Sequence, residues 1–533
     1  MFGELRVIVD ALLSKDKLKS IDFGTVVDAL GEGQIEGSAT ASKARITDKT
    51  STAYKNAFLK DLFLNKTAVL QADASNTSPI NSDFNYPTDQ NRLIFEFQDG
   101  TANNEILFAA SQQSSEVITG DKGQECSFPV GGSATPRSGT ITNSSIDTVQ
   151  VKVKFDQFFK LNTENGNRES TSVRVLIKVN PNNASQATVI DETITGKSFN
   201  PYSRDFGINF KDFPNFNATN FFPVVVSVER ANDVGDENTF NTMRLAEIRQ
   251  IIREQNNYPN IAYSSLRFSS ELFTSAPNRI FRVRGKLVKI PHNATVDYTN
   301  GRLTYSGTFN GTFKTDKEWT SDPAFVLYDL LTDSVSGCAI PESELNVFSF
   351  FGVSKYCSQL VDDLNGGQEP RFSINVNINN RRDAMAVIKD ICSVMRAIPY
   401  YEEGTIKISQ DAPKDIDNPS SVSFDYLFNN ANVVNGQFVY SGSSSKTRFN
   451  VINVSYFDLE TQEIDYVTVK DSTAQQKYGT QTKTINTFGT TSSSMAQRVG
   501  KWFLQTQQNQ TETCTFETNI ASGSVIRIGD IIG

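Results

Sequence analysis

A chain of 533 residues is long enough for three or four domains of about 150 residues each. Hydrophobic residues make up 38% of it and charged residues 21%, which excludes a disordered chain. The formal net charge of −9 argues against a protein that grips nucleic acid or anionic lipid headgroups through a basic surface. The 38 Phe and 16 Tyr residues, with abundant Thr, Asn and Ser, favour β-structure.

No apolar run approaches the ~20 residues of a membrane span, so we expect no stable membrane insertion by this segment. The stretch LRVIVDALL near the N-terminus contains Asp10 and lacks a preceding basic region, so it does not fit a secretion signal. The cysteines are odd in number, far apart and form no CxxC motif, which predicts buried free thiols in a reducing cytoplasm. They are Cys126, Cys338, Cys357, Cys392 and Cys514.

The stretch VVDALGEGQIEG (26–37) superficially resembles a nucleotide-binding loop. The third glycine, Gly37, comes one place too late for G-x-G-x-x-G, and Glu32 and Glu36 would repel a phosphate. The following SATASKARI also lacks the apolar periodicity of a helix that docks on a sheet. We therefore interpret Gly31, Gly33 and Gly37 as a structural turn between strands.

A compact β-sandwich is predicted after residue 145. The flexible stretch PVGGSATPRSGTITNSS (129–145) suggests a boundary, and Val173, Val175, Ile177 and Val179 then alternate on one face. VQVKVKF and FFPVVVSVER alternate in the same way. MRLAEIRQIIRE (243–254) stays ambiguous, because its apolar spacing suits a helix and a strand would continue the module.

From FRVRGKLVKIP (281–291) onward, helices and strands interleave. SDPAFVLYDLLT predicts a helix capped by Ser321 or Asp322, and SELNVFSFFGVSKYCSQLV predicts a second. A third helix carries an apolar stripe and ends before Pro399, and a fourth places four residues on one side ahead of the strand TETCTFET. The stripe of the third helix is Ala384, Ile388, Ile391 and Met395, and the fourth has Met495, Val499, Trp502 and Phe503.

The sequence offers little chemistry. His292, the single histidine, follows a proline at a strand end, which favours a solvated turn residue over a catalytic base. His and Cys clusters for zinc, G-x-S-x-G and phosphate-loop motifs do not occur. Asp411, Asp415 and Asp417 miss the spacing of a calcium loop, and Asp362 with Asp363 fits a surface charge as well as half of a glycosidase pair. We expect no enzyme activity, no cofactor and no metal.

Several segments, in the same order along the chain, resemble the tip attachment protein J family of lambda-type siphophages, the host-specificity or central tail-fibre proteins. The resemblance covers most of residues 275–533 and is faint over 38–256. The segments are IDFGTVVDALGEGQIEG, NYPNIA, FRVRGKLVKIP, YSGTFNGTFKTDKEWTSDPAFVLYDLLT, YCSQLVDD, EPRFSINVNINNRRDAMAVIKDICSVMRAIPYYEEGTIKISQD and VTVKDSTAQQKYGTQTKTINTFGTTSSSMAQRVGKWFLQTQ. Phe309, Phe325 and Tyr328 stand where relatives tend to carry tryptophan, which keeps the sites aromatic.

The resemblance implies a β-rich α+β multidomain protein, with hub barrels and α+β hub domains that form a homotrimeric ring, and an inserted β-sandwich. The expected domains are an N-terminal extension (1–20), a first hub domain (21–145), the inserted sandwich (146–270), a helix-containing hub domain (271–412) and a further hub or barrel domain (413–533). The glycine turn would feed the first hub barrel. The hub core helices would use Phe325, Ile388, Ile391, Met395 and Trp502.

Such a protein is a virion component of the tail tip, assembled in the host cytoplasm. It would close the tail tube, anchor the receptor-binding central fibre, and contact a distal tail protein, the tape-measure protein and other tail-tip proteins. DNA would touch it only in transit. The host receptor would be reached through regions C-terminal to this chain, because Val525, Ile526 and Ile528 suggest a strand, Gly529 and Asp530 a turn, and the next strand has no room to finish before Gly533.

Two alternative classes are a tail-associated glycan depolymerase and a carbohydrate-binding adhesin. The depolymerase would need a long β-helix repeat with paired carboxylates, and no repeat occurs in the sequence. The adhesin would account for the β-module at 146–270 but not for the helix-rich region that follows.

Overall fold

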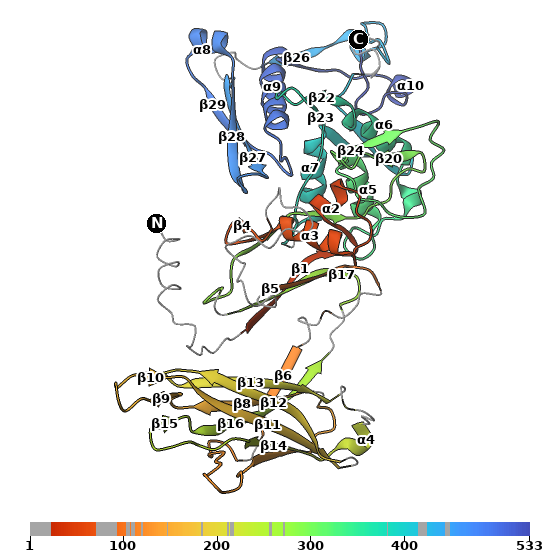
Figure 1. Cartoon of the computed structure of the whole chain (residues 1–533). Coiled ribbons are helices and arrows are strands. Elements are labelled where there is room, and N and C mark those ends of the chain that lie inside the picture. The colour runs from red at the N-terminus through yellow and green to blue at the C-terminus, as the bar shows by residue number, and fades with distance from the viewer. Residues whose placement is uncertain are drawn as a thin grey trace. The chain divides into compact units, whose positions relative to one another are not determined.

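A computed structural model of the chain shows a β-rich α+β protein with several separate sheets (Figure 1). It divides into two compact units, residues 1–30 with 79–278, and residues 31–78 with 279–533. The structure describes residues 23–70, 93–102, 107, 112–118, 121–146, 148–182, 185–210, 213, 218–254, 258–269, 272–380, 382–413, 424–442 and 448–533. The expected extension at 1–20 lies outside these residues. No helix in the described ranges is long and apolar enough to cross a membrane.

The first unit contains a sandwich of two antiparallel four-stranded sheets (Figure 1). Their orders are β12-β11-β14-β7 and β13-β8-β16-β6. The strands are β6 (Gln112–Val117), β7 (Arg137–Ile141), β8 (Thr148–Phe155), β11 (Thr171–Pro181), β12 (Ala187–Gly196), β13 (Tyr202–Asn209), β14 (Val224–Arg230) and β16 (Met243–Glu254). A three-stranded sheet β10-β9-β15 and the short helix α4 (Ala218–Phe221) belong to the same unit. The bounds of that sheet are Phe159–Leu161 for β9, Arg168–Glu169 for β10 and Thr239–Phe240 for β15.

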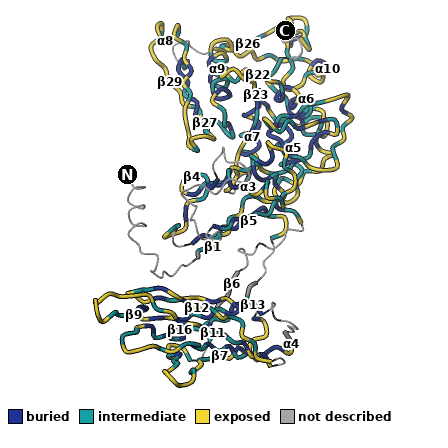
Figure 2. The backbone as a smooth tube through the Cα atoms, viewed as in Figure 1, coloured by how far each residue is buried: buried dark blue, intermediate teal, exposed yellow. Residues whose placement is uncertain are grey.

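Alternating burial builds the sandwich, as the period of two predicts. In β11, Val173, Val175, Ile177 and Val179 are fully buried while residues between them are half-buried or exposed (Figure 2). β8 and β14 bury alternate valines in the same way, and all three strands share one hydrophobic cluster. The two inner faces therefore form a dry core of mostly branched aliphatic side chains.

The strands of the sandwich run from 112 to 254, whereas the predicted module ran from 146 to 270. β6 and β7 precede residue 146, and β7 lies inside the stretch 129–145 that was interpreted as a flexible boundary. Residues 261–269 form β17 of a different sheet, β1-β17-β5, with β1 at Phe23–Glu32 and β5 at Leu93–Asp99. Gly and Ser made the β7 segment resemble a loop, although its backbone pairs with β14.

The ambiguous segment 243–254 is strand β16, not a helix. The register against β8 shifts between Leu245 and Glu247, which marks a β-bulge. The bulge brings Leu245 and Ile248 to the same buried face although they are three residues apart. A three-residue spacing is also typical of a helix face, so the bulge explains the ambiguity.

A fully buried arginine, Arg230, closes the end of β14. Its guanidinium donates to the carbonyl oxygens of Asn232 (2.8 Å), Asp233 (2.7 Å) and Asn241 (2.9 Å). Among the described residues no carboxylate lies within 4.0 Å of it, and burial lowers the pKa of Arg230 to about 10. The side chain therefore acts as a charged clamp on the loops around residues 232 and 241.

Replacing Arg230 with alanine should destabilise the sandwich by about 3 kcal/mol, because three carbonyl groups lose their donor and a cavity opens where the buried side chain lay. Hydrogen exchange of β11 and β14 in the full chain measures the loss. Arg204 in β13 is a matched control, since its ion pair with Glu192 is half exposed, and R204A should change the free energy by less than about 0.5 kcal/mol. An equal loss of stability in R230A and R204A would contradict the role of Arg230 in holding these loops.

The second unit packs helices and short sheets together. Its N-terminal part has β2 (Ile35–Ser38), α2 (Ala39–Lys43), α3 (Thr52–Asp61), β3 (Leu62–Leu64) and β4 (Thr67–Ala68). β18 (Arg279–Phe281) pairs with β3, and β19 (Val283–Lys286) pairs with β2, so segments more than 200 residues apart form one body. The short helix α2 occupies part of SATASKARI, where no docking helix was expected, and it buries Ala41.

The predicted helices of the second unit are present. They are α5 (Pro323–Thr332), α6 (Val347–Cys357), α7 (Ala384–Val394) and α9 (Ser493–Asn509). The remaining elements are β20 (Ala294–Val296), β21 (Leu303–Tyr305), η3 (Glu342–Glu344), β22 (Leu360–Asp362), β23 (Gln368–Pro370), β24 (Ala397–Glu402), β25 (Thr405–Gln410), η4 (Val434–Gly436), β26 (Val439–Gly442), β27 (Val451–Asp458), β28 (Glu463–Lys470), α8 (Ser472–Tyr478), β29 (Thr482–Asn486), β30 (Glu512–Thr515) and α10 (Ile520–Gly523).

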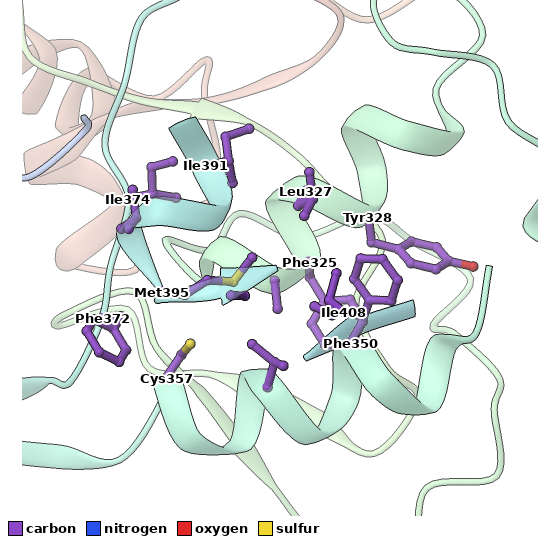
Figure 3. Packing of buried hydrophobic residues seen from close by; sticks show 14 of the residues in the cluster. Phe325, Leu327, Tyr328, Phe350, Cys357, Phe372, Ile374, Ile391, Met395 and Ile408 are labelled. Atoms are coloured by element: carbon purple, nitrogen blue, oxygen red, sulfur yellow. The ribbon is translucent and has the colours of Figure 1, made fainter. Parts of the chain in front are cut away.

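α5, α6, α7 and β25 converge on one large core (Figure 3). Phe325, Ile388, Ile391 and Met395 lie in this buried cluster, while their role in a hub stays a prediction. Trp502 lies outside this cluster, although the sequence places it on the apolar side of the helix that is now α9. Met495 of α9 reaches the core, while Trp502 is half-buried at the surface, because the 17-residue helix serves two clusters and turns Trp502 away from both.

Asp322 caps α5 from inside the protein. One carboxylate oxygen accepts from the backbone N–H groups of Ala324 (3.1 Å) and Phe325 (3.0 Å). The other accepts from the hydroxyls of Ser354 (2.7 Å) and Ser358 (3.4 Å) of α6 and its C-cap. Burial raises the pKa of the Asp322 carboxyl, although these hydrogen bonds oppose the shift. A single side chain thus fixes the start of α5 against the end of α6.

Two expectations about barrels and the C-terminus differ from the structure. Within the described residues every sheet has an open strand order, and no barrel closes. Sheets of two to four short strands are too narrow to close on themselves. The residues Val525, Ile526 and Ile528, expected as a strand, follow helix α10 in turns, and only Ile532 forms a parallel bridge, to Tyr426.

Candidate assembly surface

His292 and the carboxylates considered above for catalysis or metal binding lie in turns and loops or at the end of a strand, where the structure describes them. His292 is an exposed turn residue, as predicted, whose ring stacks on Phe309 at 6.0 Å between centroids. Its Nδ1 lies 3.4 Å from the carbonyl oxygen of Thr312. In the described part of the chain, no three His, Cys, Asp or Glu side chains gather as a metal site. Asp415 and Asp417 lie outside the described residues.

Asp362 and Asp363 shape the hairpin between β22 and β23. A carboxylate oxygen of Asp363 accepts from the backbone N–H groups of Asn365 and Gly367, both at 2.8 Å. These backbone hydrogen bonds lower the pKa of Asp363. Asp362 accepts from Leu364 N at 2.7 Å, so both carboxylates are used in the turn.

The cysteines divide by exposure. Cys126, Cys357 and Cys392 are buried, and burial raises the pKa of the Cys126 and Cys392 thiols to about 12. Such thiols are poor nucleophiles at neutral pH. The expectation of burial is met only in part at Cys338, which is half-buried, and fails at Cys514. Cys514 is exposed because it lies opposite Tyr440 in the exposed sheet of β26 and β30.

The glycine-rich stretch connects β1 with β2. Gly33 (φ +77°) and Gly37 (φ +100°) have left-handed backbones that favour glycine, while Gly31 lies within β1. The nearby start of α2 is occupied by the buried carboxylate of Asp61, which accepts from Thr40 N at 2.7 Å. A phosphate would have to displace that carboxylate, so this local geometry fits a structural turn.

Many large hydrophobic side chains in the last part of the chain are exposed. The large hydrophobic side chains of residues 424–440 and 520–532 that stay exposed define what we call the C-terminal surface. Ile520 is 91% exposed and Val439 is 64% exposed. Large apolar side chains that are exposed side by side mark interaction sites, and Tyr440 and Ile532 of this set line one groove. The members are Phe424, Leu427, Val434, Val439, Tyr440, Ile520, Val525, Ile528 and Ile532.

A shallow groove of about 830 Å³ lies on this surface. Phe428 and Phe438 both pack against Phe516, at 4.7 and 5.3 Å between ring centroids, and form its floor. Tyr440 and Cys514 come from the sheet of β26 and β30, in which every residue is exposed. Within the described residues this sheet has two strands, and its outer edges carry backbone groups that another strand could pair with.

Two family models match the chain. Residues 132–254 match the FNIII-A domain of tip attachment protein J, and this range covers most of the sandwich. Residues 383–532 match a putative phage tail protein family, and this range contains α7, α9 and the C-terminal surface.

Curated relatives extend the similarity over most of the chain. The tip attachment protein J of Escherichia phage SECphi27 is 29% identical over 486 residues, which is 89% of this chain and 36% of the relative. That of Escherichia phage SECphi4 is 27% identical over 97% of this chain and 41% of the relative. A solved receptor-binding domain of spike protein P1 from bacteriophage PM2 aligns with 26% of this chain and 93% of its own at 10% identity, with a TM-score of 0.17. The resemblance predicted from the sequence is therefore confirmed: this chain is a relative of tip attachment protein J and spans about two-fifths of the length of the curated proteins it matches.

Proposed function

We propose that this chain is the hub portion of a phage tail-tip protein for host attachment. In this role it closes the tail tube, anchors a receptor-binding central fibre and guides DNA delivery without catalysing a reaction. The observation that carries the proposal is the similarity to tip attachment protein J over 89% of the chain. The match of residues 383–532 to a phage tail family supports it independently of the sandwich.

The proposed assembly is a homotrimeric ring in the virion, formed in the host cytoplasm. A closed ring uses a heterologous contact, in which one surface of each copy meets a different surface of the next. The C-terminal surface offers one such apolar face, and the exposed Phe457, Ile464 and Tyr466 of the β27–β28 hairpin offer a second. The distal tail protein, the tape-measure protein and other tail-tip proteins are the further partners we propose.

The acidic balance of the chain suits a ring through which DNA passes. Each basic contact to a phosphate adds salt-sensitive binding that would slow transit. A formal net charge of −9 keeps such contacts few. Host recognition would belong to the fibre that the ring anchors.

Light scattering on the purified chain tests the ring directly. We expect a species of three times 59.0 kDa, because one copy leaves two apolar surfaces exposed. The same measurement on tail tips released from particles serves as the control for assembly that needs partner proteins. A chain that stays monomeric in both preparations would contradict the proposed ring.

A further inference from the structure

Arg396 links α7 to β24 with a left-handed backbone, at φ +53°. Its N–H donates to the carbonyl oxygen of Ser393 at 3.3 Å, and its own carbonyl oxygen accepts from Asp411 N at 2.9 Å. Glycine adopts this conformation without strain, whereas a residue with a side chain costs about 1 kcal/mol or more. An arginine at such a position suggests that its side chain has a use.

The guanidinium of Arg396 lies between two aromatic rings. Its Cζ is 4.8 Å from the ring centroid of Trp502 and 5.2 Å from that of Phe372. Burial lowers its pKa to about 10, so it stays charged at neutral pH. Its Nη2 donates to the carbonyl oxygen of Arg498 at 3.4 Å, whereas its buried Nε–H has no hydrogen-bond partner. Among the described residues no carboxylate lies within 4.0 Å of the guanidinium. A buried donor without a partner costs stability, and the guanidinium keeps hydrogen-bonding capacity that the described residues do not use.

Two more arginines lie close enough to influence Arg396. The charges of Arg371 and Arg498 contribute to the lowered pKa of Arg396, and the Nε–H of each also lacks a partner. Arg498 pairs with Glu369 at 2.7 Å, while Arg371 stacks on the ring of Tyr356 at 4.5 Å and forms no ion pair within the described part of the chain.

Asp411, the carboxylate that lines the pocket, is a single negative charge beside the guanidinium groups of three arginines. Asp411 accepts a hydrogen bond from the indole N–H of Trp502 at 2.9 Å. Arg396 and Asp411 are the charged residues of the pocket lining. Arg371 and Arg498 lie outside the lining and add positive charge beside Arg396, while Glu369 is paired with Arg498.

A pocket of about 380 Å³ opens beside Arg396. Its walls combine aromatic rings, the guanidinium and side chains from the C-terminal end of α9 that can donate and accept hydrogen bonds. The lining residues used here are Tyr356, Arg396, Asp411, Trp502, Gln505 and Asn509.

We propose that this pocket binds a carboxylate presented by an acidic peptide segment of a partner protein. The positive charges of Arg396, Arg371 and Arg498 favour an anion, and Asp411 on the wall would repel the second charge of a phosphate. The guanidinium supplies donors for the carboxylate, and the amides of Gln505 and Asn509 supply groups for the peptide backbone beside it. The site is separate from the C-terminal surface, so its occupancy does not depend on the proposed ring.

The test uses the full chain with W319F, which leaves Trp502 as the single tryptophan and a reporter inside the pocket. The probe is the capped peptide of four glutamates, with the matching glutamine peptide as control. We expect a saturable change in Trp502 fluorescence with the glutamate peptide alone. R396G should weaken this binding at least ~10-fold, and the relief of backbone strain should offset part of the stability lost with the aromatic contacts, so the variant stays folded. R382Q, which removes an exposed arginine at the other end of α7, should bind as the parent does.

Three further results decide the case. D411N should tighten the glutamate peptide several-fold, since it removes a repelling charge. Inorganic phosphate should compete only weakly. D415N/D417N should leave binding unchanged, and tighter binding by that variant would assign the pocket to the chain's own carboxylates and overturn the proposal. A glutamine peptide that binds equally well, or R396G that binds like the parent, would also overturn it.

Discussion

Replacing Asp322 with alanine should destabilise the core of α5, α6 and α7 by about 3 kcal/mol. The variant loses the cap of two backbone N–H groups at the start of α5 and leaves the hydroxyls of Ser354 and Ser358 without their acceptor. D322N should cost less than about 1 kcal/mol at pH 7, because the amide oxygen keeps the cap while the amide nitrogen can donate to the serine hydroxyls, which then act as acceptors. Urea unfolding followed by the fluorescence of Trp319, in a W502F background, reports on this core.

The stability difference between the parent and D322N should depend on pH. Burial raises the folded-state pKa of Asp322 above its unfolded value of ~3.9, so the folded protein favours the protonated carboxyl. The stability from this group is fully present below pH ~3.9 and is lost as the pH rises through the folded pKa. The advantage of the parent over D322N should therefore shrink from pH 4 upward. An advantage that grows over this range would show that the hydrogen bonds outweigh burial.

Replacing Val439 with glutamate should abolish tail-tip assembly while leaving the single chain folded. Val439 is 64% exposed in β26, so a charge there costs the monomer less than about 0.5 kcal/mol. In an assembled contact each copy would bury an unpaired carboxylate at a cost of about 3 kcal/mol or more. We expect a loss of infectious titre of at least ~100-fold in phage carrying the variant, from that energy.

Val130 is the matched control for Val439. It is 69% exposed and belongs to the first unit, outside the C-terminal surface. V130E should assemble and infect like the parent, and both variants should have the parent's Tm. Normal titre with V439E, or an equal loss with V130E, would show that the C-terminal surface takes no specific part in assembly.

The sequence predicted elements whose periodicity is local. Alternating valines in β11 and the capped stripe of α5 each depend on residues close in the chain, so both were predicted correctly. β16 could not be assigned because a bulge at Leu245 disturbs its period of two. The pairing of β19 with β2 joins residues more than 200 positions apart, which no local pattern reveals.

The candidate surfaces were harder to predict because exposure is a tertiary property. Val439 and Tyr440 have the composition of a buried strand, and only the two-stranded sheet in which they lie leaves them exposed. Trp502 sits on the apolar side of α9 by spacing, yet it lies at the pocket beside Arg396. The left-handed backbone of Arg396 has no sequence signal, since arginine rarely adopts it.

Electron cryo-microscopy of the particle's tail tip tests the central claim most directly. The account predicts three copies of this chain in a closed ring at the end of the tail tube, with the C-terminal surface covered by a neighbouring chain and more Asp and Glu than Lys and Arg facing the lumen. A tail tip that lacks this chain, or holds it as single copies with Val439 and Tyr440 in solvent, would contradict the account.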